Sequence, residues 1–302
     1  VGLGAMPIYR MGTEEQKERL LPKFLNNEYQ TCMALTESQA GSDLGQLSAS
    51  ARRDVDHWIV NGSKLFITNG NADIVFALVR TDPKSRGLKG ISVVIVPNKI
   101  RERVNVKVTK IEDKICLHGS PTCEIVFENS EAELLGAEGD GFKIMIALMN
   151  EARLAMAAHA IGIASAAIDE AKKYAAERVT MGKPIICHPM VADMLYEMEL
   201  EVRGMRALCY EAAIASDWTD IYAHNNDKQN YKKWKKRYRR LTPLCKYLCA
   251  EKTVTITRNA LQILGGYGIC RDYPVERLVR ESLIVPIYEG TSQIQSLMVL
   301  KD

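Results

Sequence analysis

After a short helical pattern near its start, this chain has the hydrophobic pattern of strands, which changes to that of long helices at the segment of glycines and acids in residues 136–141. Before this segment, short apolar runs are separated by turns that contain Pro and Gly, a pattern typical of short β-strands. After it, apolar and small residues recur at the spacing of helices that pack closely together. The runs predicted as strands are residues 31–35, 74–79, 91–96, 104–110 and 123–127. The sequence therefore predicts an α+β protein, in which a compact antiparallel β-barrel or sandwich precedes a helical domain like a four-helix bundle.

Two local signals predict turns and helix ends in the first half of the chain. Thr13 is followed three residues later by Gln16, so the pair can form a capping box at the start of a helix that runs to about Phe24. Asn61-Gly62 separates the apolar runs 57–60 and 63–68. Because this dipeptide tolerates positive φ values, it predicts a β-hairpin with a type I′ turn.

Long helical patterns dominate the second half of the chain. The predicted helices are residues 142 to about 182, 191–216 and 242–264. Thr242 is well placed as the N-cap of the last one, with Pro243 at its first helical position. Residues 217–241 then lie between two helices and are interpreted as an insertion.

The net charge of +3 conceals a local basic run within this insertion. Residues 228–240 contain eight basic residues and no acid, and without them the chain has 32 basic and 37 acidic residues. Interleaved Tyr231, Trp234 and Tyr238 would suit a nucleic-acid site, in which bases stack on aromatic rings. A charge run is more often a solvated face, so the sequence disfavours nucleic-acid binding.

Composition excludes several other protein classes. With 47% hydrophobic and 25% charged residues the chain is typical of a soluble globular protein, and no uninterrupted apolar run is long enough to cross a bilayer. The eight cysteines are scattered without a CxxC pair, which favours reduced thiols over a zinc site or a disulfide framework. His118 has no nucleophile or metal ligand near it in sequence, so it is interpreted as structural.

Glu289 is the strongest candidate for a catalytic residue. It lies between Tyr288 and Gly290, and Thr291 and Ser292 after it can begin a helix. A base that removes a weakly acidic C–H proton needs partial burial to raise its pKa, and a neighbouring glycine lets backbone amides approach the substrate. The alternative is an acid that stabilises a helix N-terminus through the helix dipole.

The Tyr-Glu-Gly-Thr segment resembles the catalytic segment of the acyl-CoA dehydrogenase family, and further motifs extend this resemblance over residues 1–302. The resemblance implies that Glu289 removes the pro-R α-proton of an acyl-CoA while the β-hydride passes to N5 of FAD, giving a trans-2-enoyl-CoA. It also implies that the Glu289 amide polarises the thioester carbonyl. Thr291 and Gln293 are implied contacts of FAD, and Gly290 is an implied contact of the substrate.

Residues 36–43 look on their chemistry alone like a plain turn, but they resemble the flavin loop of the family, with Ser38 where proline is usual. The implied contacts with FAD and CoA are Thr36, Gly41 and Ser42, with Ser42 also a substrate contact. Residues 66–70 resemble the segment in which an aromatic residue, here Phe66, covers a face of the flavin and a threonine, here Thr68, bonds its edge. Without the family, a core aromatic next to an exposed turn would be the preferred interpretation.

Two further motifs imply an oligomer. Residues 178–183 resemble a segment that contacts the FAD of a neighbouring subunit through residues matching Arg178 and Thr180, with Met181 replacing the usual Phe and His188-Pro189 where a glutamine is common. Gln262, Gly265 and Gly266 resemble a second contact of this kind, although a Gly-Gly pair can also simply end a helix. The resemblance therefore implies a homo-oligomer, a dimer or a tetramer.

Arg153 matches an arginine beside the CoA-thioester site of the family, and the resemblance makes it a substrate contact. Its position in a helix would otherwise suggest a solvated surface residue. Some relatives carry the base one residue before this arginine, but the chain has Ala152 there.

The resemblance implies three domains: residues 1–29 as the remnant of an N-terminal helical domain in a truncated chain, 30–137 as the middle β domain, and 138–302 as the C-terminal helical domain with the insertion 217–241. The insertion makes a bacterial subgroup of the family the nearest one, and this resemblance leaves CoA-phosphate binding and partner docking open as roles of the insertion. Electrons are expected to leave to an electron-transfer flavoprotein, in the bacterial cytoplasm or in the mitochondrial matrix of a eukaryote. The alternatives are an acyl-CoA oxidase that uses oxygen, and a non-catalytic relative that binds acyl-CoA or nucleic acid.

Overall fold

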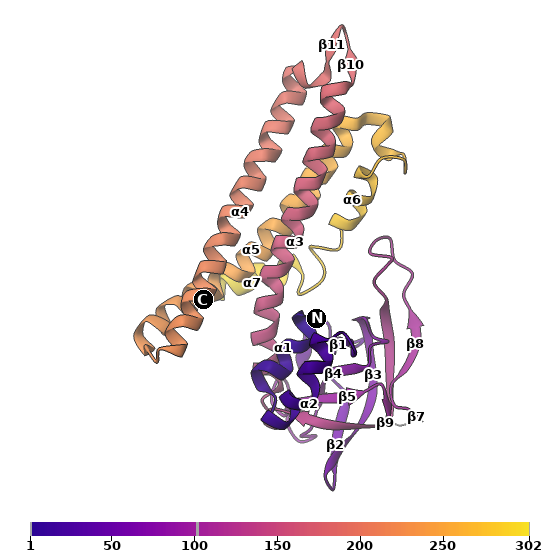
Figure 1. Cartoon of the computed structure of the whole chain (residues 1–302), viewed down its shortest axis with the longest axis vertical. Helices are drawn as coiled ribbons and strands as arrows, with labels where there is room; N and C mark the ends of the chain where they lie inside the picture. Colours follow the sequence, from indigo (N-terminus) through magenta and orange to yellow (C-terminus); the bar gives the residue numbers. More distant parts are fainter. Residues whose placement is uncertain (1, 101–102, 302) are drawn as a thin grey trace. The chain divides into compact units, whose positions relative to one another are not determined.

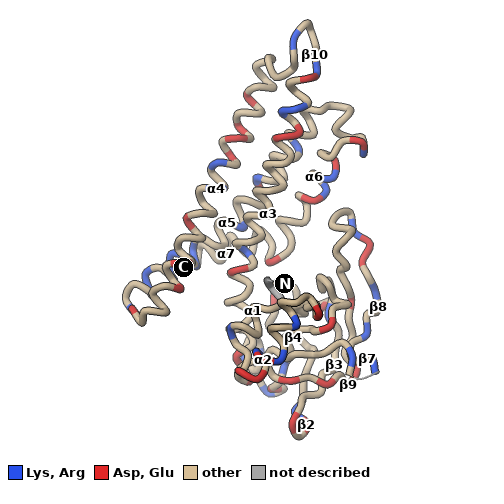
Figure 2. Tube along the Cα trace, viewed as in Figure 1, with Lys and Arg blue, Asp and Glu red and all other residues tan. Residues whose placement is uncertain are grey.

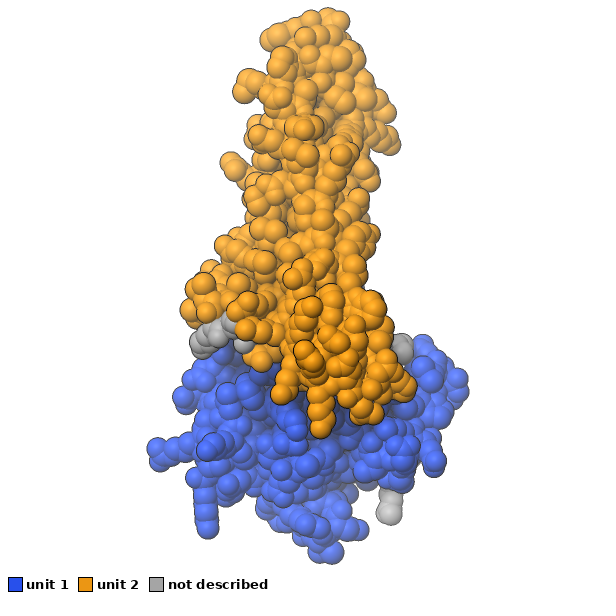
Figure 3. Space-filling model, turned by 90° about the vertical axis from the view of Figure 1, so that its left-hand side faces the viewer, with its two compact units in different colours: residues 1–149 blue, residues 150–302 orange. Residues whose placement is uncertain are grey.

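The computed structural model describes residues 2–100 and 103–301, which divide into two compact units, residues 1–149 and 150–302 (Figure 3). Val1, the start of the segment interpreted as the remnant of a helical domain, lies outside the described residues. The described remainder of that segment is mostly helical.

The first unit begins with helices α1 (Gly2–Met11) and α2 (Glu14–Leu25) (Figure 1). The predicted capping box is confirmed, because the Thr13 hydroxyl accepts from the Gln16 amide at 3.2 Å and the Gln16 side chain accepts from the Thr13 amide at 3.1 Å. The helix places Phe24 edge-to-face against Phe76 of the sheet, with ring centroids 6.5 Å apart. This contact fixes the apolar face of α2 on a buried cluster of strand residues.

Seven strands of the first unit form one sheet, and two short strands form a separate ribbon. The sheet contains β1 (Thr31–Ala34), β2 (Ser50–Asp54), β3 (His57–Thr68), β4 (Ile74–Arg80), β5 (Ile91–Pro97), β8 (Lys107–Ile111) and β9 (Thr122–Leu135); the ribbon contains β6 (Lys99–Ile100) and β7 (Arg103–Val104). The pairings β4–β2–β3–β9–β5–β4 form a closed circuit, as expected for a barrel. The expectation of a purely antiparallel sheet is corrected, since β1 and β2 both pair with β4 in parallel.

The predicted hairpin at Asn61-Gly62 is wrong. Both residues lie inside the continuous strand β3, where the register with β9 shifts between Val60 and Gly62. Gly62 has a φ of 134°, and a Cβ there would lie 2.7 Å from the Cα of Ala49. A β-bulge needs the same permissive backbone as a tight turn, so the dipeptide signal alone could not distinguish them.

The second unit consists mainly of long helices. The elements after the β-sheet are α3 (Gly141–Glu177), whose first residues belong to the first unit, the hairpin β10 (Val179–Thr180) and β11 (Lys183–Pro184), α4 (Pro189–His224), α5 (Lys228–Leu264), α6 (Val275–Ser282) and α7 (Ser292–Lys301). Short 3-10 segments lie at Leu44–Gln46, Ile185–Cys187 and Gly265–Ile269. Small buried residues of α3, such as Ala160 and Ala164, belong to the same apolar core as residues of α4 and α5.

By length and composition alone, α3 is apolar enough to cross a membrane, with a mean hydropathy of 1.3 in its most apolar window. From the sequence, only uninterrupted apolar runs were considered as membrane spans. Charged residues interrupt the apolar pattern of α3, so this helix was not among them. Because 44% of that window is buried, the apolar composition of α3 is accounted for in good part by its packing in the helical core.

The segment 217–241 is helical, so the predicted helix ends at residues 216 and 242 are wrong. Helix α4 continues to His224, and α5 begins at Lys228, where the Asp227 carboxylate caps it by accepting from the Asn230 amide at 3.0 Å. Thr242 lies inside α5 and donates its hydroxyl to the Tyr238 carbonyl at 2.8 Å. The ring of Trp218 on α4 stacks on Trp234 of α5 across this helical hairpin, with centroids 6.0 Å apart, and on Tyr222 of its own helix, with centroids 5.4 Å apart.

The eight basic residues of the insertion are all exposed along α5, where Figure 2 marks them in blue. The aromatic side chains between them are half-buried. Trp234 stacks against Trp218 of α4, and Lys235 lies over the ring of Tyr231, so neither ring is free to stack on a base.

Candidate active site

The loop Tyr288–Gly290 before α7 has an unusual backbone. Glu289 has a φ of 55° and Gly290 a φ of 93°, so two consecutive residues lie in the left-handed region. A Cβ at Gly290 would collide with the side-chain amide of Gln295. The glycine is therefore required by the fold, whereas Glu289 is held in a conformation that is unfavourable for a residue with a side chain.

Three side chains from three helices hold the two carbonyl groups of this loop. Arg153 of α3 donates from Nε to the Glu289 carbonyl at 3.2 Å, and Lys246 of α5 donates from Nζ to the Gly290 carbonyl at 2.8 Å. Gln295 of α7 donates from Nε2 to both carbonyls, at 3.3 Å each. All three side chains are buried, so both peptide groups of the loop are fixed in place.

A fourth contact ties the loop to α3. The Tyr288 hydroxyl lies 2.9 Å from Nδ1 of His159. The residue before the candidate base is therefore anchored to the same helix that carries Arg153.

The electrostatics of the loop suit a base. Burial raises the pKa of the Glu289 carboxyl above its usual value, and the charges of Arg153 and Lys246 act in the opposite direction. Burial also lowers the pKa of Arg153, and it lowers the pKa of Lys246 to about 8. A carboxyl group with a raised pKa holds an abstracted proton more strongly near neutral pH.

The default expectation of a solvated Arg153 is wrong. Its side chain is 4% exposed, and Nη1 donates to the Asn150 side chain at 3.1 Å. Ala152 beside it is fully buried and carries no titratable group. Arg153 faces the Glu289 loop because this side of α3 packs against the segment before α7.

Lys246 and Gln295 were not predicted from the sequence. Lys246 lies between Cys245 and Cys249 on the apolar face of α5, and a lysine on such a face was the available signal. Gln295 lies four residues after the Tyr-Glu-Gly-Thr segment, and no role was predicted for it. The sequence does not indicate what these two side chains bind. Both donate to the Gly290 carbonyl, which is 44 residues from Lys246 and 5 residues from Gln295.

In the first unit, the predicted flavin loop is built on a buried acid that the sequence analysis missed. The Glu37 carboxylate accepts from the amides of Ser48 and Ala49 at 2.8 and 3.0 Å and from Nζ of Lys64 at 2.8 Å. Lys64 is fully buried and also donates to the carbonyls of Leu35 and Leu78.

This ion pair is strongly shielded from solvent. Burial raises the pKa of Glu37, but Lys64 and the hydrogen bonds from Ser48 outweigh it and lower that pKa overall, while burial lowers the pKa of Lys64 to about 8. The pair fixes the start of the loop whose tip presents Gly41 and Ser42 to solvent.

Phe66 and Thr68 are both exposed at the end of β3. Phe66 has a φ of 57° at a second register shift, between Lys64 and Ile67, and its side chain is 63% exposed. The interpretation of Phe66 as a core aromatic is therefore wrong. The Leu65 amide donates to the Thr36 carbonyl at 2.9 Å, so the structure brings the flavin-loop candidates and the Phe66 bulge together.

A second group of predicted residues gathers at the far end of α3. Arg178 and Thr180 lie at the β10–β11 hairpin, and the side chain of Thr180 is 3.0 Å from Nε2 of His188. Tyr174, one turn before Arg178, packs against Tyr267 and Tyr273, with centroids 6.0 and 6.4 Å apart. These aromatic contacts bring Arg178 near the exposed Gly265-Gly266 segment at the end of α5.

This group is remote from Glu289 within the same unit. Arg153 contacts the Glu289 loop, and Arg178 lies 25 residues further along the chain. At the rise of an α-helix that separation is about 37 Å. The two groups lie toward opposite ends of α3, as Figure 1 also shows for β10 and α7.

Thr291 and Gln293 lie at the start of α7. The Thr291 hydroxyl accepts from the Ile294 amide at 3.4 Å, and Gln293 is exposed. Between them, the buried Ser292 hydroxyl has no hydrogen-bond partner, and neither has Oε1 of the buried Gln295.

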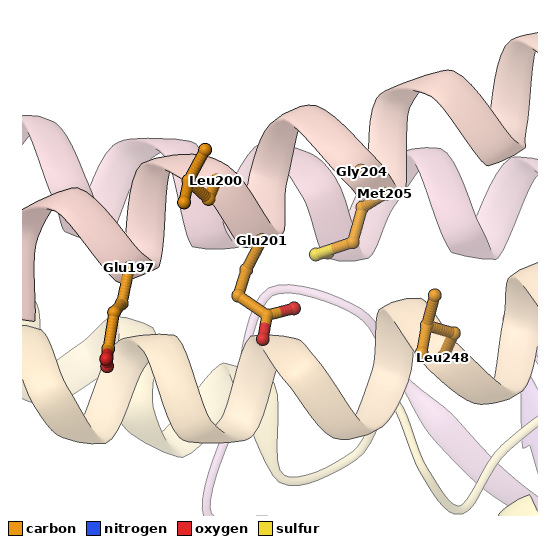
Figure 4. A pocket seen from close by; sticks show the side chains of 6 residues that line it. All are labelled: Glu197, Leu200, Glu201, Gly204, Met205 and Leu248. Carbon is orange, nitrogen blue, oxygen red and sulfur yellow. The ribbon is translucent and has the colours of Figure 1, made fainter.

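A groove of about 460 Å³ between α4 and α5 is separate from all these residues (Figure 4). Glu197 and Glu201 point from α4 toward α5, and Glu201 pairs with Lys252 at 2.6 Å. No predicted site residue lines this groove. Within residues 2–100 and 103–301, no cluster of three or more His, Cys, Asp or Glu side chains could hold a metal ion, and the eight cysteines are free thiols.

Comparison with protein families gives two matches. Residues 32–130 match the middle domain of acyl-CoA dehydrogenases, and residues 139–302 match their C-terminal domain. An acyl-CoA dehydrogenase of Bacillus subtilis (strain 168) is 39% identical over 99% of this chain and 75% of its own length.

Solved structures give the same result. Butyryl-CoA dehydrogenase from Megasphaera elsdenii superposes with a TM-score of 0.88 at 33% identity, over 100% of this chain and 75% of its own. A chain in a structure of the electron transferring flavoprotein of Acidaminococcus fermentans also gives a TM-score of 0.88, at 34% identity, over 100% of this chain and 75% of its own.

Proposed function

Since this chain belongs to the acyl-CoA dehydrogenase family, we propose that it dehydrogenates a fatty or related acyl-CoA thioester to the trans-2-enoyl-CoA. Members of this family are FAD-dependent oxidoreductases that act on CH–CH bonds in fatty acid metabolism. The observation that carries the proposal is the Glu289 loop, in which the half-buried Glu289 has a raised carboxyl pKa and two buried cations, Arg153 and Lys246, bind the backbone carbonyls of the loop.

The residues present fit FAD. Phe66 is an exposed aromatic ring on a strained bulge beside Thr36, a combination that suits a flat ring system. The Ser292 hydroxyl is a buried polar atom without a partner at the start of α7. A Cβ at Gly41, Gly265 or Gly266 would meet nothing, so the backbone at these points is open to a close approach.

We assign the cofactor contacts by unit. In the first unit they are Thr36, Gly41, Ser42, Phe66 and Thr68. In the second unit they are Thr291 and Gln293 near Glu289, with Arg178, Thr180, Gln262, Gly265 and Gly266 at the far end. When bound, FAD supplies the acceptor for the hydride that leaves the β-carbon of the substrate.

Glu289 is the base that removes the α-proton in this proposal. Partial burial favours the protonated product of that step, and the charges of Arg153 and Lys246 keep a fraction of the carboxyl ionised before it. The Glu289 backbone amide donates to the thioester carbonyl, where negative charge develops as the proton leaves. Arg153, Gly290 and Ser42 contact the substrate.

The distance along α3 supports a role for a second subunit. Because Arg178 lies about 37 Å of helix from the Glu289 loop, Arg178 and Thr180 serve the cofactor of a neighbouring protomer. Homotetramers are typical of the family, and a homo-oligomer is therefore part of the proposal.

We assign an electron-transfer flavoprotein as the electron acceptor. The likeness to a chain in a structure of such a flavoprotein supports this choice. We assign the proposed reaction to the bacterial cytoplasm or to the mitochondrial matrix, and the relatives from Bacillus subtilis and rat mitochondria support this assignment. Turnover measured with oxygen alone and with added flavoprotein distinguishes this dehydrogenase from an oxidase.

The direct test is Glu289→Gln, assayed with butyryl-CoA and a ferrocenium dye acceptor. We expect the variant to retain bound FAD and its yellow absorbance, and to lose turnover by at least about 10³-fold, since the amide cannot accept a proton. Turnover within about tenfold of the unsubstituted protein would refute Glu289 as the base. Glu281→Gln, an acid on α6 outside the loop, is the matched control and is expected to leave turnover unchanged.

A further inference from the structure

Lys246 is a fully buried cation for which the family resemblance predicted no role. Its side chain on α5 is fully buried, and so are Cys245, Cys249 and Ala250 of the same helix. Burying an ammonium group costs several kcal/mol unless it gains strong partners. Its hydrogen bond of 2.8 Å goes to the Gly290 carbonyl, on the residue that follows the proposed base.

We propose that Lys246, together with Gln295, is a positioning residue that holds the Glu289–Gly290 peptides in the conformation the base requires. This inference rests on the proposed function, because it assigns what Lys246 does for Glu289. Lys246 does not contact the substrate in this proposal and acts through the loop.

The backbone conformation of the loop explains why these hydrogen bonds are needed. Glu289 has a φ of 55°, which is costly for a residue with a side chain and persists only where surrounding contacts enforce it. The contacts that enforce it are hydrogen bonds from Arg153, Lys246 and Gln295 to two successive carbonyls. Loss of one donor lets the peptide on that side rotate toward a negative φ, and a displacement of about 1 Å at the carboxylate is enough to lower the rate about 10²-fold.

Lys246 also affects the charge of the base. The groups that face it are Glu289 from the loop, Arg153 from α3 and Glu251 from its own helix. Arg153 in turn faces Tyr238 of α5. The positive charge of Lys246 lowers the pKa of Glu289, opposing the effect of burial, so its removal raises that pKa further.

The test compares Lys246→Met, Lys246→Arg and Gln295→Met with the unsubstituted protein, using butyryl-CoA and a ferrocenium acceptor. Methionine preserves the buried volume of Lys246 without charge or donors, and arginine restores both. We expect Lys246→Met to lower kcat about 10- to 100-fold with KM changed less than about threefold, and to move the acid limb of kcat/KM to higher pH. Lys246→Arg should recover most of kcat.

Gln295→Met separates positioning from charge. It removes two hydrogen bonds to the same carbonyls but no charge, so we expect kcat to fall while the acid limb stays in place. Lys252→Met is the matched control, because Lys252 lies on α5 but pairs with Glu201 of α4. It should keep kcat within about twofold.

Two results would overturn the inference. One is a Lys246→Met variant with an unchanged acid limb and kcat within about twofold of the unsubstituted protein. The other, decisive if Lys246→Met does not fold, is a Gln295→Met variant with unchanged kcat. Failure of the proposed function is distinguishable, because it appears as turnover in Glu289→Gln. An inactive Glu289→Gln beside a fully active Lys246→Met refutes only the role of Lys246.

Discussion

Nε of Arg153 lies 3.2 Å from the carbonyl oxygen of Glu289, across 136 residues of sequence. The bond joins the first half of the long helix α3 to the loop that precedes α7. It is made to the backbone of Glu289 and not to its carboxylate, so the guanidinium fixes the position of the residue while its charge acts on the side chain. One residue thereby influences both the geometry and the ionisation of the proposed base.

These two effects of Arg153 can be separated by substitution. Arg153→Lys keeps the charge but loses the planar Nε donor, and we expect kcat to fall about tenfold with the acid limb of kcat/KM unchanged. Arg153→Met loses both, so the acid limb should also move to higher pH. Stopped-flow measurement of flavin reduction across pH 5 to 9 checks both outcomes, and equal pH profiles for the two variants would contradict the division of roles.

The ionisation of Glu289 determines a pH dependence of activity. Because burial raises its pKa, the acid limb of kcat/KM should lie above pH 4.5, the ordinary value for a glutamate. A limb at or below that value would contradict a half-buried base. The profile is measured with saturating dye acceptor, so that the chemical step is observed.

The same shift predicts a stability effect of defined sign. The folded protein binds the Glu289 proton more tightly than the unfolded chain does, since its folded pKa is raised. This contribution to stability is fully present below the unfolded pKa and is lost as pH rises through the folded pKa. Removing the titration with Glu289→Gln should therefore flatten the pH dependence of the melting temperature above pH 4.5.

Gly290 is predicted to tolerate no side chain. Gly290→Ala places a methyl group against the Gln295 amide at a φ of 93°, so we expect a loss of about 2–4 kcal/mol in the free energy of unfolding and a large loss of kcat. Gly162→Ala on α3 is the control, because a Cβ there meets nothing. That variant should gain about 0.5–1 kcal/mol from the higher helix propensity of alanine. Urea unfolding measures both.

The buried pair Glu37–Lys64 should be essential to the first unit. Lys64→Met leaves a buried carboxylate without its cation, and we expect a loss of about 3–5 kcal/mol in the free energy of unfolding. The double variant Glu37→Gln with Lys64→Met should recover part of this loss, because no unpaired charge remains. Urea unfolding followed by fluorescence of Trp58, in strand β3, reports on this unit.

Lys110→Met provides the comparison with a pair whose lysine is exposed. Lys110 and Glu112 form an ion pair in the same unit, with side chains 58% and 17% exposed, so water reaches the ammonium group and screens the interaction. The urea midpoint of this variant should not change. A midpoint lowered as far as that of Lys64→Met would show that burial is not what distinguishes the two pairs.

Local sequence patterns gave those features that depend on neighbouring residues. The capping box at Thr13 and Gln16 was predictable because both partners lie within one helical turn. The change of period near residue 140 was predictable because strands and helices repeat at different spacings. The family followed from motifs, and so did the expectation that Glu289 is the base, which stays a prediction.

Other features were decided by contacts between segments distant in sequence. Whether Asn61-Gly62 turns or bulges depends on its pairing with β9, and whether Arg153 is solvated depends on the loop that α3 packs against. Contacts distant in sequence also determine that Lys64 donates to the Glu37 carboxylate and that Lys246 donates to the Gly290 carbonyl. The sequence by itself determined which part of the chain forms the sheet, which part forms the long helices and where the motifs lie, since these depend on short-range propensity and spacing. Only the tertiary structure decided which polar side chains are buried and which groups they bind, because the free energy of a buried charge depends on partners that folding brings to it.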